Sequence, residues 1–406
     1  MNRILIKNAS EIATPVGKYK RGKELGDLFV ITDGSLLIED GKIKAVGKSS
    51  EIEIPEYDLK IIDASGKTII PGFVDCHTHL VFGGSREDEF SKRITGATYQ
   101  KIAAGGGGIK STVRETRKAS KEQLLKNSLE LLHKVLRNGT TTVEIKTGYG
   151  LTVEDEMKML DVIEELNRLQ PVEVIPTFLG AHAFPDDVPR DRYVEMVMEM
   201  IPEASKKAKF CDVFCEEGYF TPEETRKIFE KGLEYGMKPR LHADQLTSNG
   251  GTRLAVETGA VSAEHLEQIS NTDIELLAGS ETTAVLLPGV SFFLNYGYPP
   301  ARKIIDSGCI TALATDFNPG SCMCLSMQLV MSIACTQMQM TPAEVLTAST
   351  LNAAYSLESY DVGTIKTGKQ ADILIMNVCN YKYIPYFFGE NHVDCVIKNG
   401  KIVFEK

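Results

Sequence analysis

Two histidines, His77 and His79, stand one residue apart at the end of an apolar run, in the stretch PGFVDCHTHLVFGGSRE. Side chains alternate between the two faces of a strand, so both imidazoles would point to the same side. Two neutral imidazoles on one face are half of a metal site. A pair of ordinary strand histidines bonded to backbone carbonyls explains this stretch equally well, so the rest of the chain has to decide between them.

Other polar residues follow apolar, β-branched runs in the same way. They are Tyr149, His182, His242, His265 and Asp316, so that five of the seven histidines of the chain occupy such places. One subset offers three imidazole nitrogens and one carboxylate, a ligand set that suits zinc or iron and leaves a position for water: His77, His79, His242 and Asp316. Each residue alone is more simply a hydrogen-bonded core or loop residue, and only their joint placement favours a metal.

A metal site with an open position would do hydrolytic chemistry. A bound water becomes a nucleophile near neutral pH if a base takes its proton, and His265 and the second oxygen of Asp316 are candidates for that catalytic proton transfer. Arg86, in a loop with Gly83 and Gly84, would reach over the site and pair with a substrate carboxylate. On its own, Arg86 is more simply a solvated surface residue. Lys146 is a weaker candidate, as the bridging ligand of a second metal, and one metal ion is favoured.

The elements that must position these residues alternate between apolar strands and amphipathic helices. Such βα repeats predict a parallel sheet that is buried on both faces. The strand candidates span residues 73–80, 141–150, 172–183, 210–219, 238–245, 260–267, 282–289 and 310–318. Eight βα units predict an α/β fold of the (β/α)8 TIM barrel type, and these barrels carry their chemistry at the carboxyl ends of the strands.

Both ends of the chain follow a different pattern, of short alternating strands separated by hairpin turns. The stretches DGKIKAV and NGKIVFE, one near each end, are alike. We therefore expect one small β-sandwich domain that is built from both termini. The predicted organisation is residues 1–70 for the first part of this domain, 71–355 for the barrel and 356–406 for the second part.

Composition excludes some classes of protein. The chain of 406 residues has a net charge of −10, which argues against nucleic acid or an anionic membrane as a partner but not against a small anionic substrate. No signal peptide and no apolar stretch long enough to span a bilayer is evident, which predicts a cytoplasmic protein. Nine cysteines without a CxxC pair fit reduced thiols, and the CxC of Cys322 and Cys324 is expected to be structural.

Several motifs together resemble a known family. PGFVDCHTH, a later HAD and a TD aspartate are similar to the amidohydrolase superfamily of metal hydrolases, which have a (β/α)8 barrel and a β-sandwich from both termini. HTHLVFGGSREDEF, EIKTGYGL, FLGAHAFP, LHADQ, SAEHLE, ATDFNPGS and YIPYFFGENHV, in this order over nearly the whole chain, resemble more closely the imidazolonepropionase family of L-histidine degradation.

This resemblance implies roles for individual residues. It implies metal binding by His77, His79, His242 and Asp316, and acid or base catalysis by His265. It implies substrate contacts from Arg86, Tyr149, His182, Asn318, Gly320 and Ser321. Many relatives have a glutamate three residues after the metal-binding histidine, where this chain has Gln245. Because a glutamine carries no proton, Gln245 would only hydrogen-bond the substrate ring.

The reaction that the resemblance implies is hydrolysis of 4-imidazolone-5-propanoate to N-formimidoyl-L-glutamate, with one zinc or iron ion per subunit in a homodimer. Another cyclic amidase or a formimidoylglutamate deiminase of the same superfamily is the alternative. A non-catalytic scaffold with the same barrel is the alternative from another class, but such a protein would normally lack a metal ligand, and none is missing. The glycine-rich stretch at residues 103–112 fails the phosphate-loop pattern and is expected to be a lid.

Overall fold

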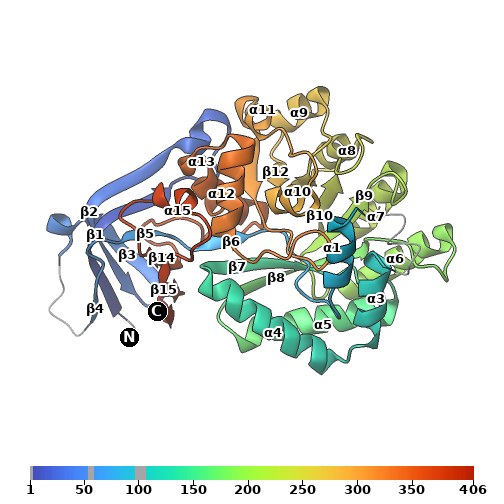
Figure 1. The fold of residues 1–406 in the computed structure, drawn as a ribbon, viewed down its shortest axis with the longest axis horizontal. Coiled ribbons are helices and arrows are strands. Elements are labelled where there is room, and N and C mark those ends of the chain that lie inside the picture. Colours follow the sequence, from blue (N-terminus) through green and yellow to red (C-terminus); the bar gives the residue numbers. More distant parts are fainter. Residues whose placement is uncertain (1–2, 54–58, 97–106) are drawn as a thin grey trace.

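The computed structural model describes residues 3–53, 59–96 and 107–406 and contains two large sheets. Figure 1 shows the blue N-terminal and the red C-terminal segments together in one small β domain, and the middle of the chain in a larger domain of strands and helices. The predicted fold class, a TIM barrel with a small β domain from both termini, is confirmed.

The larger domain is a barrel of eight parallel strands in sequential order. The strands are β6 (Phe73–Asp75), β7 (Thr140–Lys146), β8 (Glu173–Ala181), β9 (Phe210–Cys215), β10 (Lys238–Ala243), β11 (Ser262–His265), β12 (Thr283–Leu286) and β13 (Ile310–Leu313). Each overlaps one of the eight predicted segments and is shorter than that segment. The first predicted strand ran to residue 80, whereas β6 ends at Asp75 and the histidines follow it.

The barrel is closed by the segments that follow β6 and β13. Thr78 and Phe317 form an isolated parallel bridge. The His79 amide donates to the Phe317 carbonyl over 2.9 Å, and the Asp316 amide donates to the His77 carbonyl over 3.0 Å. Barrel closure therefore places Asp316 directly beside the two histidines.

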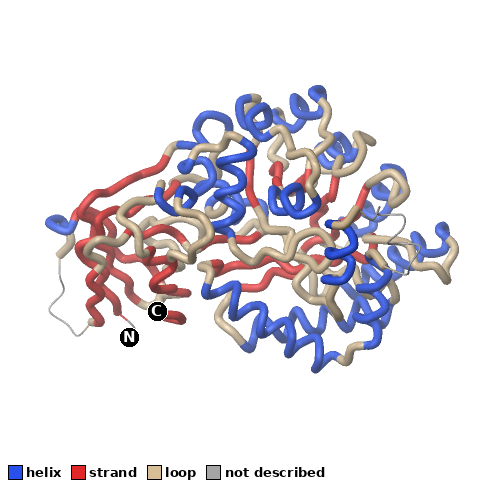
Figure 2. The backbone as a smooth tube through the Cα atoms, viewed as in Figure 1, coloured by secondary structure: helices blue, strands red, loops and turns tan. Residues whose placement is uncertain are grey.

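Helices cover the outside of the barrel (Figure 2). The helices are α1 (Glu87–Ile94), α3 (Ile109–Lys118), α4 (Lys121–Arg137), α5 (Val153–Leu169), α6 (Arg190–Ala204), α7 (Pro222–Glu234), α8 (Gly251–Glu257), α9 (Asn271–Ala278), α10 (Pro288–Leu294), α11 (Ala301–Asp306), α12 (Met327–Met338), α13 (Pro342–Ala348), α14 (Leu351–Ser356) and α15 (Tyr383–Tyr386). Side-chain caps define several starts: the Ser120 hydroxyl accepts from the Gln123 amide at α4, and the Thr152 hydroxyl accepts from the Asp155 amide at α5.

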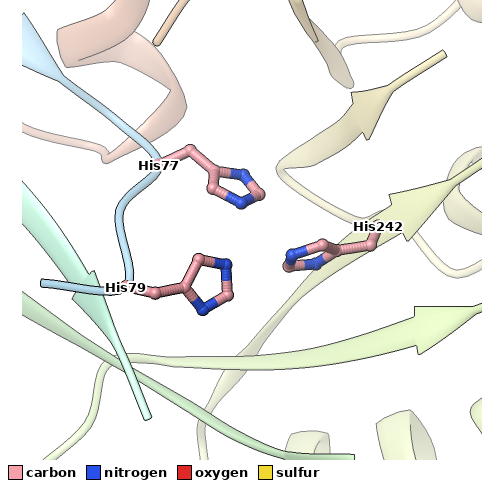
Figure 3. Close-up of side chains that lie close together, drawn as sticks. All are labelled: His77, His79 and His242. Atoms are coloured by element: carbon pink, nitrogen blue, oxygen red, sulfur yellow. The ribbon is translucent and has the colours of Figure 1, made fainter. Parts of the chain in front are cut away.

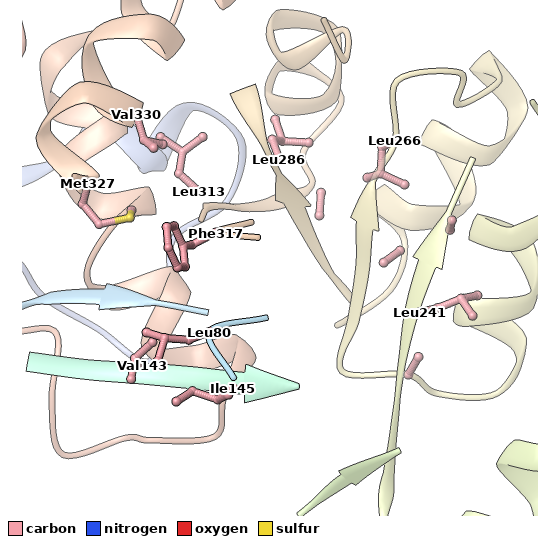
Figure 4. Close-up of a cluster of buried hydrophobic side chains, with 14 of the residues drawn as sticks. Leu80, Val143, Ile145, Leu241, Leu266, Leu286, Leu313, Phe317, Met327 and Val330 are labelled. Atoms are coloured by element: carbon pink, nitrogen blue, oxygen red, sulfur yellow. The ribbon is translucent and has the colours of Figure 1, made fainter. Parts of the chain in front are cut away.

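The main hydrophobic core joins the barrel strands to these helices. Figure 4 shows Met327 and Val330 of α12 beside Leu313 and Phe317 at the end of β13. These side chains are almost completely buried, and burial of each contributes roughly 1.5–3 kcal/mol. The core therefore fixes the ends of β6 and β13, from which the histidines and Asp316 extend.

The terminal domain is one mixed sheet of eight strands. Its elements are β1 (Arg3–Pro15), β2 (Leu28–Glu39), β3 (Lys42–Lys48), β4 (Lys60–Asp63), β5 (Thr68–Pro71), β14 (Ile373–Met376), β15 (Val393–Lys398) and β16 (Lys401–Glu405), with short 3-10 helices η1 (Gly22–Gly26) and η2 (Ser49–Glu51). Ile43 of β3 and Ile397 of β15, near opposite ends of the sheet, share one buried cluster, so the sheet curls over its own core. The domain boundaries at residues 70 and 355 remain a proposal.

Two further expectations concern features of the whole chain. Among the described residues, no helix combines the length and the apolar character that crossing a membrane requires. All nine cysteines lie in the described part of the chain and none forms a disulfide, as predicted. Cys322 is buried in an apolar cluster. The predicted lid falls partly on residues 103–106, which lie outside the described residues.

Asn352 on α14 ties the N-terminal segment to the barrel. Its amide oxygen accepts from the Lys20 amide over 2.9 Å, and its amide nitrogen donates to the carbonyls of Lys20 and Thr311 over 2.8 Å each. The Asn352 side chain is completely buried. We predict that Asn352→Ala lowers the free energy of unfolding by about 3 kcal/mol, because each buried group left unpaired costs roughly 1–3 kcal/mol. Urea unfolding measures this, and the exposed Asn377→Ala should keep the wild-type midpoint.

Candidate metal centre and substrate cavity

A cavity of about 550 Å³ lies at the carboxyl ends of the barrel strands. Every residue that the sequence analysis assigned to substrate binding lines it, namely Arg86, Tyr149, His182, Gln245, Asn318, Gly320 and Ser321. His79, His242, His265 and Asp316 also line the cavity, and His77 lies just beneath them, completely buried. The structure thus brings together every predicted site residue.

The predicted metal ligands converge on one point (Figure 3). His77 and His79 extend from the segment after β6 and His242 extends from β10, and the three rings point toward one another. One nitrogen from each ring lies within 4.8 Å of the others. The Oδ1 atom of Asp316 lies 3.3 Å from Nε2 of His77 and 3.4 Å from Nε2 of His79.

Several of these converging atoms are buried without a hydrogen-bond partner. Among the described residues, they include Nε2 of His77, Nε2 of His242 and Oδ1 of Asp316. Buried polar atoms normally have a hydrogen-bond partner. A cluster of buried polar atoms without one therefore indicates donor atoms that are arranged to bind a ligand. Imidazole nitrogens with one carboxylate oxygen are the donors that zinc and iron accept. The residues present therefore fit a single catalytic metal ion.

Two carboxylates, Asp212 of β9 and Glu264 of β11, come from the two strands that flank β10 and orient the imidazoles from behind. Oε2 of Glu264 lies 2.5 Å from Nδ1 of His77, and Oδ1 of Asp212 lies 3.1 Å from Nδ1 of His242. Burial disfavours the charged His77 ring, but Glu264 and Asp316 together outweigh this effect and raise the pKa of His77 to about 9. A metal ion must displace this proton, so metal binding should strengthen as the pH rises.

The contacts of Lys146 do not favour the role of a bridging ligand that the sequence analysis considered. Its ammonium group lies 2.8 Å from Glu144, 2.7 Å from Asp212 and 3.1 Å from Glu264, and all four side chains are completely buried. Burial alone would lower the pKa of Lys146, but the carboxylates, led by Asp212, raise this pKa above its ordinary value. A protonated amine has no lone pair for a metal. A single metal ion remains the prediction.

A buried carboxylate of α5 positions the loop that carries Tyr149. Glu156 accepts hydrogen bonds from the amides of Gly148, Gly150 and Leu151 over 2.8–3.0 Å. The Gly148 carbonyl in turn pairs with Nδ1 of His182 over 3.0 Å. A side chain at Gly148 would overlap the His182 ring, so glycine is needed there. The loop therefore holds Tyr149 and His182 together at the cavity wall.

Two arginines reach the cavity from the segment after His79. Nε and one terminal nitrogen of Arg86 both donate to Glu89 over 2.8 Å, which leaves the other terminal nitrogen above Gly320. A side chain at Gly320 would overlap the Arg86 guanidinium. Arg93 donates to the Gly320 carbonyl over 3.3 Å, and its second terminal nitrogen is buried and finds no hydrogen-bond partner among the described residues. The sequence analysis did not identify Arg93.

The loop after β13 is held by its own asparagine. The Asn318 side-chain oxygen accepts from the amides of Gly320 and Ser321 over 2.8 Å each, and its nitrogen donates to the Asp316 carbonyl over 2.8 Å. The Ser321 hydroxyl donates to Oδ2 of Asp316 over 3.5 Å. Asn318 thus lines the cavity chiefly as the residue that shapes the loop.

His265 faces the metal ligands from β11. Its ring centroid lies 5.5 Å from that of His77 and 5.3 Å from that of His242, and one of its nitrogens falls in a group with His77 and Asp316. The backbone of His265 has a φ of 80° and that of Leu266 a φ of 68°, so two successive residues adopt the left-handed region. This turn aims the His265 ring into the cavity.

The residues missed by sequence reasoning are of two kinds. Phe214, Tyr219, Leu294 and Tyr296 complete the apolar wall with Arg93, and nothing in their spacing distinguishes them from core residues. The buried charges Glu144, Asp212, Arg240 and Glu264 were also missed. They did leave a signal, because Glu144 and Arg240 stand two residues before Lys146 and His242, on the same face of otherwise apolar strands.

The comparisons with known proteins agree with this fold. Residues 68–403 match the family model "Amidohydrolase family", and the chain belongs to this family. It is 46% identical over 417 aligned positions to an imidazolonepropionase of Geobacillus sp. (strain WCH70), which covers 99% of this chain and 98% of the relative. An imidazolonepropionase of Thermoanaerobacter pseudethanolicus is 46% identical over 404 positions, covering 98% and 96%. Within the amidohydrolases, the chain thus belongs to the imidazolonepropionases.

Solved structures show the same fold at low sequence identity. A triazine hydrolase variant aligns with a TM-score of 0.78 at 18% identity, covering 100% of this chain and 95% of that protein. An adenosine deaminase from Xanthomonas campestris with bound zinc aligns with a TM-score of 0.75 at 18% identity, covering 99% and 93%. At this identity the likeness concerns the fold alone.

His242 is the ligand whose loss tests the metal centre most directly. We predict that His242→Ala, purified from metal-supplemented medium, retains little metal, because one of the converging nitrogens is gone. The loss of affinity should exceed the roughly 10- to 100-fold that changes around a ligand cause. Elemental analysis and chelator competition measure it. The exposed His133→Ala is the matched control, and equal metal loss in both variants would contradict the assignment.

Proposed function

We propose that this protein hydrolyses 4-imidazolone-5-propanoate to N-formimidoyl-L-glutamate, a step of L-histidine degradation. The observation that carries the proposal is the full-length likeness to imidazolonepropionases together with a complete candidate ligand set at the cavity. In this reaction a water adds to the ring carbonyl, the ring C–N bond breaks and the nitrogen leaves with a proton. When bound, the metal would polarise the carbonyl and make the water more acidic.

The chain supplies the groups that move protons. Burial alone would raise the pKa of Asp316, but the neighbouring imidazoles of His77, His265 and His242, led by His77, outweigh burial and keep this pKa below its ordinary value. Asp316 is therefore ionised and can take a proton from the attacking water. His265 has a ring nitrogen within 4.8 Å of a carboxylate oxygen of Asp316 and would deliver a proton to the leaving nitrogen. Gln245 lines the same cavity and would hydrogen-bond the ring.

His182 and Tyr149 would hold the ring as uncharged partners. Burial, assisted by His242, lowers the pKa of His182 to about 3, so its imidazole is neutral at working pH. Its Nδ1 pairs with the Gly148 carbonyl, which directs Nε2 elsewhere as a hydrogen-bond acceptor. Burial also raises the pKa of Tyr149, whose hydroxyl keeps its proton and can donate.

The propionate would bind the two arginines. Glu89 already occupies two donors of Arg86, so Arg86 has limited capacity for a second carboxylate. Arg93 has a buried nitrogen at the same wall, and no residue in the described part of the chain accepts a hydrogen bond from it. A carboxylate bound between them would satisfy that nitrogen and balance the second positive charge.

The proposed reaction is tested by an assay that separates it from the deiminase alternative. We predict that the purified enzyme removes the absorbance of the imidazolone ring while N-formimidoyl-L-glutamate accumulates, and that it releases no ammonia from N-formimidoyl-L-glutamate. His242→Ala should abolish the activity. Ammonia release without ring opening would favour the deiminase, and neither reaction would favour a non-catalytic scaffold.

A substitution of Arg93 tests the proposed role in propionate binding. We predict that Arg93→Met raises KM by roughly 10- to 100-fold with little change in kcat, because a charge-assisted hydrogen bond contributes about 1.5–3 kcal/mol. Steady-state kinetics measure both constants. Arg114→Met, an exposed arginine on α3, serves as the control. An unchanged KM in Arg93→Met would remove this residue from the binding site.

The finer properties belong to the same proposal. We propose one zinc or iron ion per subunit, and elemental analysis of protein purified without added metal would identify it. A homodimer, which the family resemblance implies, and a cytoplasmic location, which is expected from the sequence, stay predictions.

A further inference from the structure

Lys146 lies at the centre of a buried cluster of charges beneath the metal centre. Its side chain extends from the last residue of β7, and its ammonium group contacts Glu144, Asp212 and Glu264 from three different strands. None of these side chains is exposed. The function proposed above assigns no role to this lysine.

The carboxylates of this cluster connect Lys146 to two metal-binding histidines. Asp212 contacts Lys146 through Oδ2 and His242 through Oδ1. Glu264 contacts both Lys146 and Nδ1 of His77 through Oε2. One ammonium group therefore fixes both acceptors that orient these imidazoles.

Arg240 completes the cluster from the opposite side. It pairs with Oε1 of Glu264 over 2.5 Å and donates to the carbonyl of Cys76, the residue before His77, over 2.8 Å. It also donates to the Ser356 carbonyl over 2.7 Å. Glu264 is thus held by a cation at each oxygen, and its position has little freedom.

We propose that Lys146 is a positioning residue of the metal centre, which holds Asp212 and Glu264 so that His242 and His77 present their Nε2 atoms to one shared metal ion. Without Lys146, two adjacent buried carboxylates would repel each other and would themselves attract a cation. Asp212, His242 and Glu264 already offer ligand atoms within 4.8 Å of one another. The ammonium group occupies this space and keeps those carboxylates from competing for the metal.

A purely structural ion cluster would behave differently. Ion pairs in a protein interior gain little over apolar side chains, because desolvation offsets their attraction. If Lys146 only stabilised the barrel, its replacement would lower stability without changing the affinity of the remaining fold for metal. Metal affinity and stability therefore separate the two roles.

The test measures zinc affinity by chelator competition on apo and reloaded protein. Lys146→Gln keeps a polar side chain of similar length but removes the charge. We expect zinc affinity to fall by about 10- to 100-fold, the range found when partners behind metal ligands are removed. The control is Lys398→Met, because Lys398 is another nearly buried lysine, which pairs with Asp372 over 2.6 Å and Glu173 over 3.1 Å, far from the site. Lys398→Met should unfold at a lower temperature with wild-type zinc affinity.

A charge-balanced double variant keeps the inference testable if the single variant Lys146→Gln fails to fold. Lys146→Gln with Asp212→Asn removes one charge of each sign, so no uncompensated charge is left in the core. Because both changes act through the same contact to His242, we expect its zinc affinity to fall by less than the product of the two single effects. Wild-type affinity in Lys146→Gln or in the double variant, or an equal loss in Lys398→Met, would overturn the inference.

This inference rests on the proposed metal ligands but not on the proposed substrate. If Lys146→Gln lost zinc affinity while the wild-type protein failed to open the imidazolone ring, the proposed reaction would be wrong and the role of Lys146 would stand. If the wild-type protein opened the ring and Lys146→Gln bound zinc normally, the proposed reaction would stand and the proposed role of Lys146 would be wrong.

Discussion

The pairing of the segment after β6 with the segment after β13 is the constraint on which the site depends. Asp75 and Thr315, 240 residues apart in the sequence, meet through two hydrogen bonds to the Asp75 carboxylate, over 3.0 Å and 2.6 Å. The backbones of His77 and Asp316 pair immediately beyond them. The same contacts close the barrel and bring the ligands together, so a metal ion bound there would stabilise the closed barrel. A fold that failed to close would have no site.

The rim of the barrel departs from regular backbone geometry where the chemistry lies. Asp244, His265, Leu266 and Asp316 all have φ values between 49° and 80°. Left-handed geometry in such residues costs of order 1–3 kcal/mol each and persists only where the surroundings impose it. The buried core beneath the rim supplies that constraint, since the strands that lead into these residues are completely buried. The packing of the strands thus offsets the cost of the backbone geometry that orients the His265 and Asp316 side chains.

The sequence predicted the ligands because of a general property of parallel barrels. His77, His242 and Asp316 each follow an apolar run, and the carboxyl ends of barrel strands meet at one rim, so their convergence followed from the fold class. The ends of the strands were less predictable. The run to residue 80 is apolar enough for a strand, but only Thr78 finds a bridge partner beyond Asp75, because the closing segments bend toward the cavity.

The contacts between side chains were beyond what the sequence alone could show. Lys146 was recognised as unusual, but local spacing reveals only Glu144, two residues before it on β7, and not Asp212 and Glu264, which come from other strands. Arg93 lies on helix α1, which has no buried residue, and an arginine on such a helix is ordinarily solvated. Only the fold places its guanidinium against the Gly320 carbonyl, which belongs to a loop 227 residues away.

Because position 245 is a glutamine, proton transfer in the cavity would fall to Asp316 and His265. A glutamate at this position would supply a second carboxylate for proton transfer, whereas the amide of glutamine neither accepts nor releases a proton in the working range. The cavity wall then offers Asp316, whose Oδ1 faces the imidazoles and whose Oδ2 accepts from Ser321. One oxygen would serve the metal and the other would receive the proton. His265 offers a ring nitrogen close to this carboxylate, because ligand atoms of His77, His265 and Asp316 all lie within 4.8 Å of one another. Asp316 would therefore take the proton of the water, and His265 beside it would deliver a proton to the leaving nitrogen.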